Sequence, residues 1–168
     1  MSVAGSQSND SEPREDYPRA GLLRRLAALL YDGFLVAAIW MLLGFIIQII
    51  AGPDTNQLID GQVQTNPLID NILFLLMLAT SCGFFIWFWT RGGQTLGMIA
   101  WRIKAVSLSN QLMSPGQAMS RFLLAWPAFL LLGSGYLWIF LDVNRDALHD
   151  KLSSTKVVLL PKSHRPFN

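Results

Sequence analysis

Two oppositely charged residues mark the first long apolar stretch of the chain: Arg25 immediately precedes it and Asp32 interrupts it. Arg25 and Asp32 are seven residues apart, so they share one face of a helix. At the helical rise, Asp32 lies about 10 Å deeper than Arg25. A carboxylate at that depth in a bilayer costs about 2.5 to 3.5 kcal/mol, so it should face protein or water. Either Asp32 binds or relays a cation or proton, or it anchors a polar element through Arg25, Arg121 or a helix end.

A second group of charged residues follows the last apolar stretch. If this segment is helical, its spacing gives one polar stripe of Asp142, Arg145, Asp146, His149 and Asp150. A histidine with three nearby acids could hold a divalent metal. Charged stripes are common on helix surfaces, so the favoured interpretation is a face that is solvated or paired with Arg121 and Lys151.

A glycine-rich segment containing Gly93, Gln94, Thr95 and Gly97 follows the second apolar stretch. Its glycines permit a sharp turn and close helix approach, and the apolar residues 98–101 predict a short interfacial helix. The Lys-Ser/Thr ending of a phosphate loop is absent from this segment. The sequence also shows no pairing of a nucleophile with a base and no zinc-ligand spacing, so we expect no enzyme activity, metal or cofactor.

The composition indicates a membrane protein. Of 168 residues, 52% are hydrophobic and only 14% are charged, against about a quarter charged in soluble domains. The mean hydropathy is +0.37. A formal net charge of +2 argues against a nucleic-acid-binding module, and the single cysteine, Cys82, excludes an internal disulfide.

Two apolar stretches are long enough to cross a bilayer. Residues 26–50 and about 69–89 each supply the roughly 20 residues that a hydrocarbon core of about 30 Å requires. The second stretch ends in Trp87 and Trp89 before Arg91, which is typical of a membrane interface. We therefore predict two transmembrane helices.

A third apolar stretch, residues 122–141, is broken by Pro127 and by glycines at 133 and 135. It is either one kinked span or a re-entrant helical hairpin. Basic residues before the first span and after the second place both flanks in the cytoplasm. The tail beyond Leu141 also carries five cations, which favours the hairpin because the C-terminus then stays cytoplasmic.

Two segments favour β-strands, at residues 101–108 and 155–160. Isolated strands are unstable, so we expect them to pair on one membrane face. The predicted fold is therefore all-α and polytopic, with two long transmembrane helices, a third broken apolar segment and a small cytosolic strand pair. Residues 1–18 are expected to form a disordered polar tail, residues 19–160 the membrane domain, and residues 161–168 a flexible tail.

Four motifs in order resemble the RDD family of small bacterial membrane proteins. They are the segment from Arg25 to Gly33, the Gly93–Gly97 segment, Arg121, and Leu148-His149-Asp150 followed by Thr155. The resemblance implies that Arg25, Asp32 and Asp150 are the arginine and two aspartates that name the family, with Asp142 the weaker candidate for the last. One departure is Met98, where many relatives carry lysine.

Two functions are compatible with these features. The favoured one is a structural, assembly or partner-binding module in the bacterial inner membrane, with both termini cytoplasmic. Its expected partners are the lipid bilayer and a second copy or another membrane protein. The alternative is a secondary transporter that exchanges a monovalent cation for protons through Asp32, with Arg25 tuning its proton affinity. The resemblance implies this alternative, because a few family members have been proposed to be sodium/proton antiporters.

Overall fold

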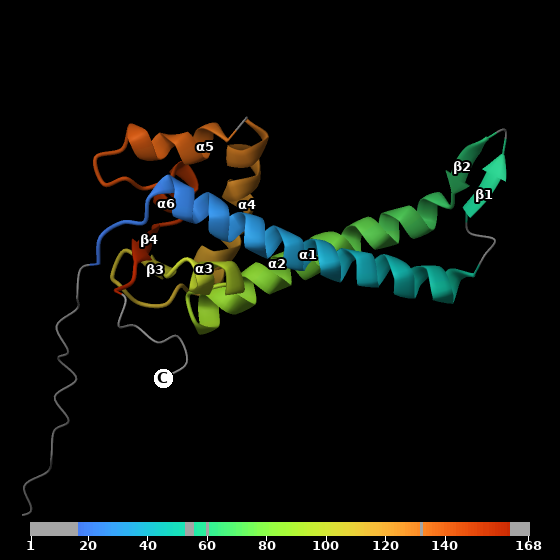
Figure 1. Ribbon diagram of the computed structural model, residues 1–168, viewed down its shortest axis with the longest axis horizontal. Helices are drawn as coiled ribbons and strands as arrows, with labels where there is room; N and C mark the ends of the chain where they lie inside the picture. Colours follow the sequence, from blue (N-terminus) through green and yellow to red (C-terminus); the bar gives the residue numbers. More distant parts are fainter. Residues whose placement is uncertain (1–16, 53–55, 60, 132, 162–168) are drawn as a thin grey trace, which may run out of the picture.

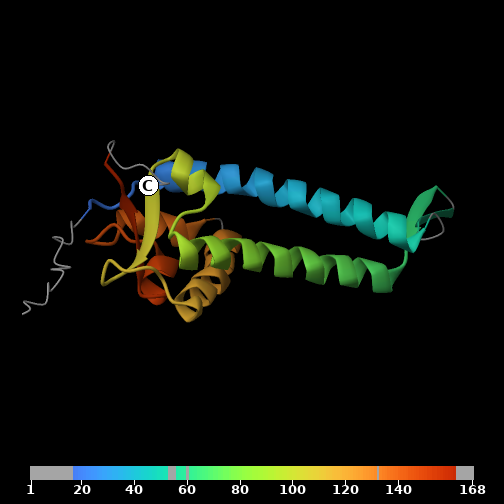
Figure 2. The same cartoon turned by 90° about the horizontal axis from the view of Figure 1, so that it is seen from below.

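The computed structural model describes residues 17–52, 56–59, 61–131 and 133–161. Two long helices run side by side (Figure 1). A strand hairpin lies at one end of them, called the far end, and the shorter elements gather at the other, called the near end. The view from below shows the same arrangement (Figure 2). The predicted disordered tails lie almost entirely outside the described residues.

The two long helices are α1 (Leu22–Ala51) and α2 (Pro67–Arg91). With 30 and 25 residues, they are about 45 and 37 Å long. Both are long and apolar enough to cross a membrane. They contain the two stretches predicted from sequence and extend each of them by one to four residues at either end.

Local signals define the ends of α2. The Asn66 side chain accepts a hydrogen bond from the backbone nitrogen of Leu68 at 3.0 Å, and Pro67 occupies the first turn. Asp70 lies in the first turn and Arg91 in the last, as the helix dipole favours. These signals fix where the second long helix begins and ends.

A hairpin joins α1 to α2 at the far end of the molecule. Its strands β1 (Asn56–Ile59) and β2 (Gln62–Thr65) are antiparallel, with Asn56 opposite Thr65. Gly61 has a φ of 75°, a value that glycine adopts without steric cost. This hairpin was not predicted from the sequence.

Among the described residues, the near end holds seven elements that are shorter than α1 and α2. They are α3 (Leu96–Ala100), β3 (Ile103–Ser107), α4 (Pro115–Leu130), α5 (Ser134–Leu137), the 3-10 turn η2 (Trp138–Phe140), α6 (Leu148–Leu152) and β4 (Thr155–Leu159). Strands β3 and β4 pair antiparallel, with Ile103 opposite Leu159. On the other edge of β4, Ala20 donates to the Val157 carbonyl at 2.9 Å. The start of α1 and the end of the described chain therefore lie beside each other.

The third apolar stretch is not one continuous helix. Helix α4 ends at Leu130, and Gly133 has a φ of 73° immediately before α5. Helix α5 packs so closely on α4 that a Cβ added at Gly135 would overlap Ala128. The stretch therefore forms two short helices joined by a turn, rather than one kinked helix.

The buried core lies at the near end. It is formed by Ala20, Ala28, Trp89, Met98, Ile103, Ala105, Met113, Ala118, Phe122 and Val157. In the far half of α1, large apolar side chains are exposed instead, including Phe45 at 64% and Ile50 at 79%. The core therefore joins the short elements to the near ends of α1 and α2.

Candidate functional site

Asp150 is the centre of a buried charge cluster in which α1, α4 and α6 meet. Its side chain is completely buried. One carboxylate oxygen, Oδ2, accepts from an Arg25 guanidinium nitrogen and from the Ala147 backbone nitrogen, the latter at 3.1 Å. The other, Oδ1, accepts from a guanidinium nitrogen of Arg121. Asp150 thus caps its own short helix and binds both arginines.

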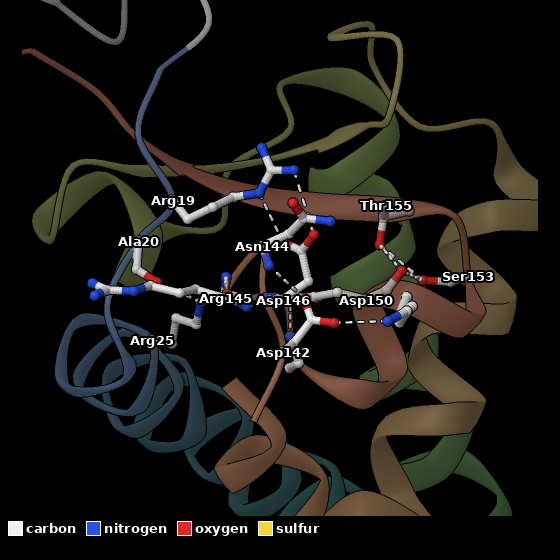
Figure 3. Close-up of polar contacts among 12 residues, drawn as sticks. Arg19, Ala20, Arg25, Asp142, Asn144, Arg145, Asp146, Asp150, Ser153 and Thr155 are labelled. Atoms are coloured by element: carbon white, nitrogen blue, oxygen red, sulfur yellow. Dashed lines mark hydrogen bonds and ion pairs between the residues drawn. The ribbon is translucent and has the colours of Figure 1, made fainter. Parts of the chain in front are cut away.

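The two arginines extend this cluster to other parts of the chain. Arg25 Nε donates to the Ala20 carbonyl at 2.9 Å, and Figure 3 draws Ala20, Arg25, Arg145 and Asp150 together. Arg121 donates to Thr155 Oγ1 at 2.7 Å, at the start of β4. Segments more than 100 residues apart in sequence are therefore held at one point.

The two arginines stabilise the ionised form of Asp150. Burial alone would raise the pKa of Asp150, but the Arg121 and Arg25 guanidiniums outweigh it and hold that pKa well below its usual value. Burial lowers the pKa of His149 to about 4 despite the opposing effect of Asp150. At neutral pH the cluster consists of an ionised aspartate, two arginines and a neutral histidine.

Asp32 lies in a separate buried site, between α1 and the start of α3. Its carboxylate accepts from Thr95 Oγ1 and, at 2.8 Å, from the Gly97 backbone nitrogen. Thr95 is also the N-cap of α3, accepting from the Met98 nitrogen at 3.3 Å. Asp32 therefore satisfies donors at a helix end, one of the two arrangements that the sequence left open.

The glycine-rich segment shapes this second site. Gly93 has a φ of 71° and lies against β3, where Ala105 donates to its carbonyl at 2.7 Å. Gln94 Nε2 donates to the Ile103 carbonyl at 2.9 Å. A Cβ at Gly97 would overlap the Ala28 backbone oxygen. Glycine at this position allows the backbones of α1 and α3 to come into contact.

The structure separates residues that the sequence placed together. Arg25 and Asp32 share a helix, but their described hydrogen bonds lead to Asp150 and to α3 respectively. The predicted stripe from Asp142 to Asp150 does not form, because only Leu148–Leu152 is helical. Asp142 instead accepts from the Asn144 and Asp146 backbone nitrogens, a local turn that competes with helix.

The acids of that segment are directed to different cations. Asp142 accepts from Lys151 at 2.7 Å, whereas Asp146 accepts from Arg19 Nε at 2.8 Å. The Lys151 hydrogen bond lowers the pKa of Asp142. His149 stays near Asp150, with 3.4 Å between Nε2 and Oδ1. Among the residues that the structure describes, there is no group of three or more His, Cys, Asp or Glu side chains that could hold a metal ion.

Several contacts of the site were missed from sequence. Arg19 was not predicted to bind Asp146, and Tyr136 was not predicted to pack on His149, where the ring centroids are 4.7 Å apart. Arg121 also lies over the Trp89 ring, with its guanidinium carbon 5.1 Å from the ring centroid. The sequence carries no periodic signal for such contacts, because they join turns and different elements.

Comparison with known proteins bears on these residues directly. The family model described as the RDD family matches residues 19–154. The chain belongs to the RDD family. The arginine and two aspartates that the sequence singled out for this family, Arg25, Asp32 and Asp150, all lie within the match. Arg25 and Asp150 bind each other, whereas Asp32 holds α3.

A curated relative is also similar to this RDD protein. It is described as uncharacterized protein RP437 of Rickettsia prowazekii (strain Madrid E), and is 30% identical over 94 residues, or 54% of this chain. The alignment covers 51% of the relative, so the chain spans about half of its length. No solved structure matches significantly.

Proposed function

We propose that this RDD protein is a structural, partner-binding module of the bacterial inner membrane. The observation that carries the proposal is that both family aspartates are engaged in contacts within the protein. All four of their carboxylate oxygens accept hydrogen bonds from other parts of the chain. Such contacts fit groups that hold a fold together, because a group that exchanges ions must release its partners in each cycle.

The proposed topology places both chain ends in the cytoplasm. Helices α1 and α2 would span the bilayer, while the α4–α5 turn re-enters it and returns. Pro18 and Ala20 lie beside β4, with the Leu159 nitrogen donating to the Pro18 carbonyl at 2.8 Å. This adjacency supports one shared face for the two ends, and basic residues near that face favour the cytoplasm.

Cysteine labelling tests this topology. In a Cys82→Ser background, Ser154→Cys lies near the end of α6 and Gly61→Cys lies in the far hairpin. A membrane-impermeant maleimide should label position 61 in intact spheroplasts and position 154 only in inverted vesicles. Labelling of both positions in intact spheroplasts would contradict the re-entrant α4–α5 turn and the cytoplasmic C-terminus.

The proposed partner-binding surface is the far half of α1 and α2. Phe45 and Phe74 are each 64% exposed there. An exposed apolar surface of this extent must be covered by lipid or by another apolar surface. A second copy or another membrane protein is the proposed occupant of part of it, alongside lipid.

Photocrosslinking in native membranes tests the partner-binding part. A benzophenone amino acid at position 45 or 74 should capture a protein of defined mass, with Leu23 at 82% exposure as a control position outside this half. Crosslinks to lipid alone from positions 45 and 74 would overturn the partner-binding role.

Cation exchange through Asp32 is tested separately. Proteoliposomes containing wild type or Asp32→Asn are compared for sodium-, potassium- and lithium-dependent proton flux at matched amounts of inserted, folded protein. The structural proposal expects no flux above empty liposomes and a lower melting temperature for the variant. Flux by the wild type that disappears in folded Asp32→Asn would replace the structural role with transport.

A further inference from the structure

Four cationic residues lie at the near ends of α1 and α2 and in the segment that follows α2. They are Arg24, Arg91, Arg102 and Lys104, and we call them the cationic band. The three arginines are exposed and the lysine is half-buried. Among the described residues, no salt bridge joins any of the four to an acid. The band is therefore positive charge that the described part of the fold does not neutralise.

The acids described nearby are already paired with other cations. Asp142 pairs with Lys151 and Asp146 with Arg19, while Asp150 binds the two buried arginines. These acids are engaged elsewhere, so a partner for the band has to bring its own negative charge.

Contacts between elements bring the band together. Arg24, in the first turn of α1, donates through Nη1 to the Trp101 carbonyl at 3.4 Å, in the peptide that links Trp101 to Arg102. A Cβ added at Gly93 would lie 2.9 Å from Lys104 Cε, so the lysine side chain lies across the turn that follows α2. The start of α1, the end of α2 and β3 thus contribute cations to one end of the two long helices.

Aromatic rings lie beside these cations, on the side towards the far end. The Arg91 guanidinium carbon is 4.6 Å from the centroid of the Trp87 ring, one helical turn nearer the far end. In α1, Tyr31 lies seven residues, or about 10 Å, beyond Arg24 in the same direction. Its ring meets Trp101 edge-on, with 6.5 Å between centroids. Tryptophan and tyrosine collect at the headgroup level of a bilayer, so this order is that of a membrane interface.

We propose that the cationic band binds the phosphate groups of anionic phospholipids. A lipid phosphate offers only acceptors to the band, whose guanidinium and ammonium groups only donate. The unneutralised charge selects lipids with a net negative charge over zwitterionic ones, in which an ammonium group balances the phosphate. Each basic residue at a membrane surface adds about fivefold to the affinity for anionic lipid.

This inference rests on the proposed placement of α1 and α2 across the membrane, and it adds the class of lipid bound at the near end. The aromatic rings favour a lipid over a soluble anion, because they place the cations at the level of the headgroups.

A matched pair of arginine variants tests the band. Arg102 and Arg145 are both exposed, and both have a left-handed backbone, with φ of 52° and 57°. Arg102→Gln removes a charge from the band, whereas Arg145→Gln makes the same change outside it. Both variants lower the net charge by one, so they differ only in where the charge is lost.

The full chain in maltoside micelles is titrated with phosphatidylglycerol or with phosphatidylcholine of identical acyl chains, and bound lipids are counted by native mass spectrometry. We expect the first phosphatidylglycerol to bind about tenfold more tightly than the first phosphatidylcholine in wild type and in Arg145→Gln. This ratio should fall about fivefold in Arg102→Gln. If Arg102→Gln does not fold, Arg91→Gln/Lys104→Gln removes two other charges of the band and should lower the ratio at least as much.

Equal affinity of the wild type for the two lipids would overturn the proposal. A ratio that is unchanged in the band variant, or that falls equally in Arg145→Gln, would also overturn it. None of these results would contradict the proposed topology, because cysteine labelling measures that separately.

Discussion

Asp150 and Asp32 are two buried acids that the protein stabilises in different ways. Asp150 is charge-compensated by two arginines from α1 and α4, and joins segments distant in sequence. Among the described residues, Asp32 accepts only from uncharged donors, the Thr95 hydroxyl and the Gly97 backbone, and holds one five-residue helix. A network of full charges should therefore be costly to disrupt at any member, whereas the Asp32 site depends on close backbone approach.

Asp150→Asn is expected to have the largest effect. It leaves two buried guanidiniums without their counter-charge, and breaking a buried pair in this way costs about 3 to 5 kcal/mol. The free energy of unfolding is measured by SDS titration in mixed micelles. Asp70→Asn, the same change at an exposed position near the start of α2, is the control and should cost less than 1 kcal/mol. Equal losses in the two variants would contradict the central role of Asp150.

Gly97→Ala should disrupt the Asp32 site next most strongly. The added methyl group overlaps the Ala28 backbone oxygen and forces α3 away from α1. Such overpacking costs about 1 to 3 kcal/mol. Gly44→Ala, in open space on the same long helix, should be neutral or slightly stabilising. Equal melting temperatures for the two variants would show that the close approach is not required.

The pH dependence of stability should come from the Asp150 cluster. The pKa of His149 is lowered to about 4 from 6.5. Between these two pH values, His149 is protonated in the unfolded chain but neutral in the folded chain. Stability should therefore fall as the pH drops from about 6.5 towards 4, with a loss of about 2 kcal/mol by pH 5. SDS titrations at pH 7 and 5 measure this loss.

His149→Phe removes the titrating group and should flatten that pH profile. Asp150 remains ionised at pH 5, because its pKa is lowered below its usual value of 3.8. A profile in the variant as steep as that of the wild type would assign the pH dependence to another group.

Thr95→Val should have the smallest effect of the four. It removes the hydroxyl that donates to Asp32 and caps α3, at a cost of about 1 kcal/mol. Thr95→Ser keeps the hydroxyl and should retain most of the stability. If serine and valine destabilise the protein equally, the loss comes from the methyl group of Thr95 and not from its hydrogen bonds.

Helix composition made the membrane helices predictable, whereas the far hairpin and the short elements were harder to predict. Residues 26–50 and 69–89 are long, continuous apolar runs, and this property is local to the sequence. The β1–β2 hairpin was missed, since its four-residue strands carry little periodic signal. The predicted helical stripe from Asp142 to Asp150 was wrong because the Asp142 side chain accepts from the backbone nitrogens of Asn144 and Asp146. Helical spacing alone does not reveal these local hydrogen bonds.

The sequence alone determined the family and the two long apolar helices, and it singled out Arg25, Asp32 and Asp150. Only the tertiary structure decided how those charges pair. Arg25 is seven residues from Asp32 but binds Asp150, 125 residues away. The physical reason is that a buried charge is stabilised by the partners that packing brings to it, and packing here joins the beginning of the described chain to its end.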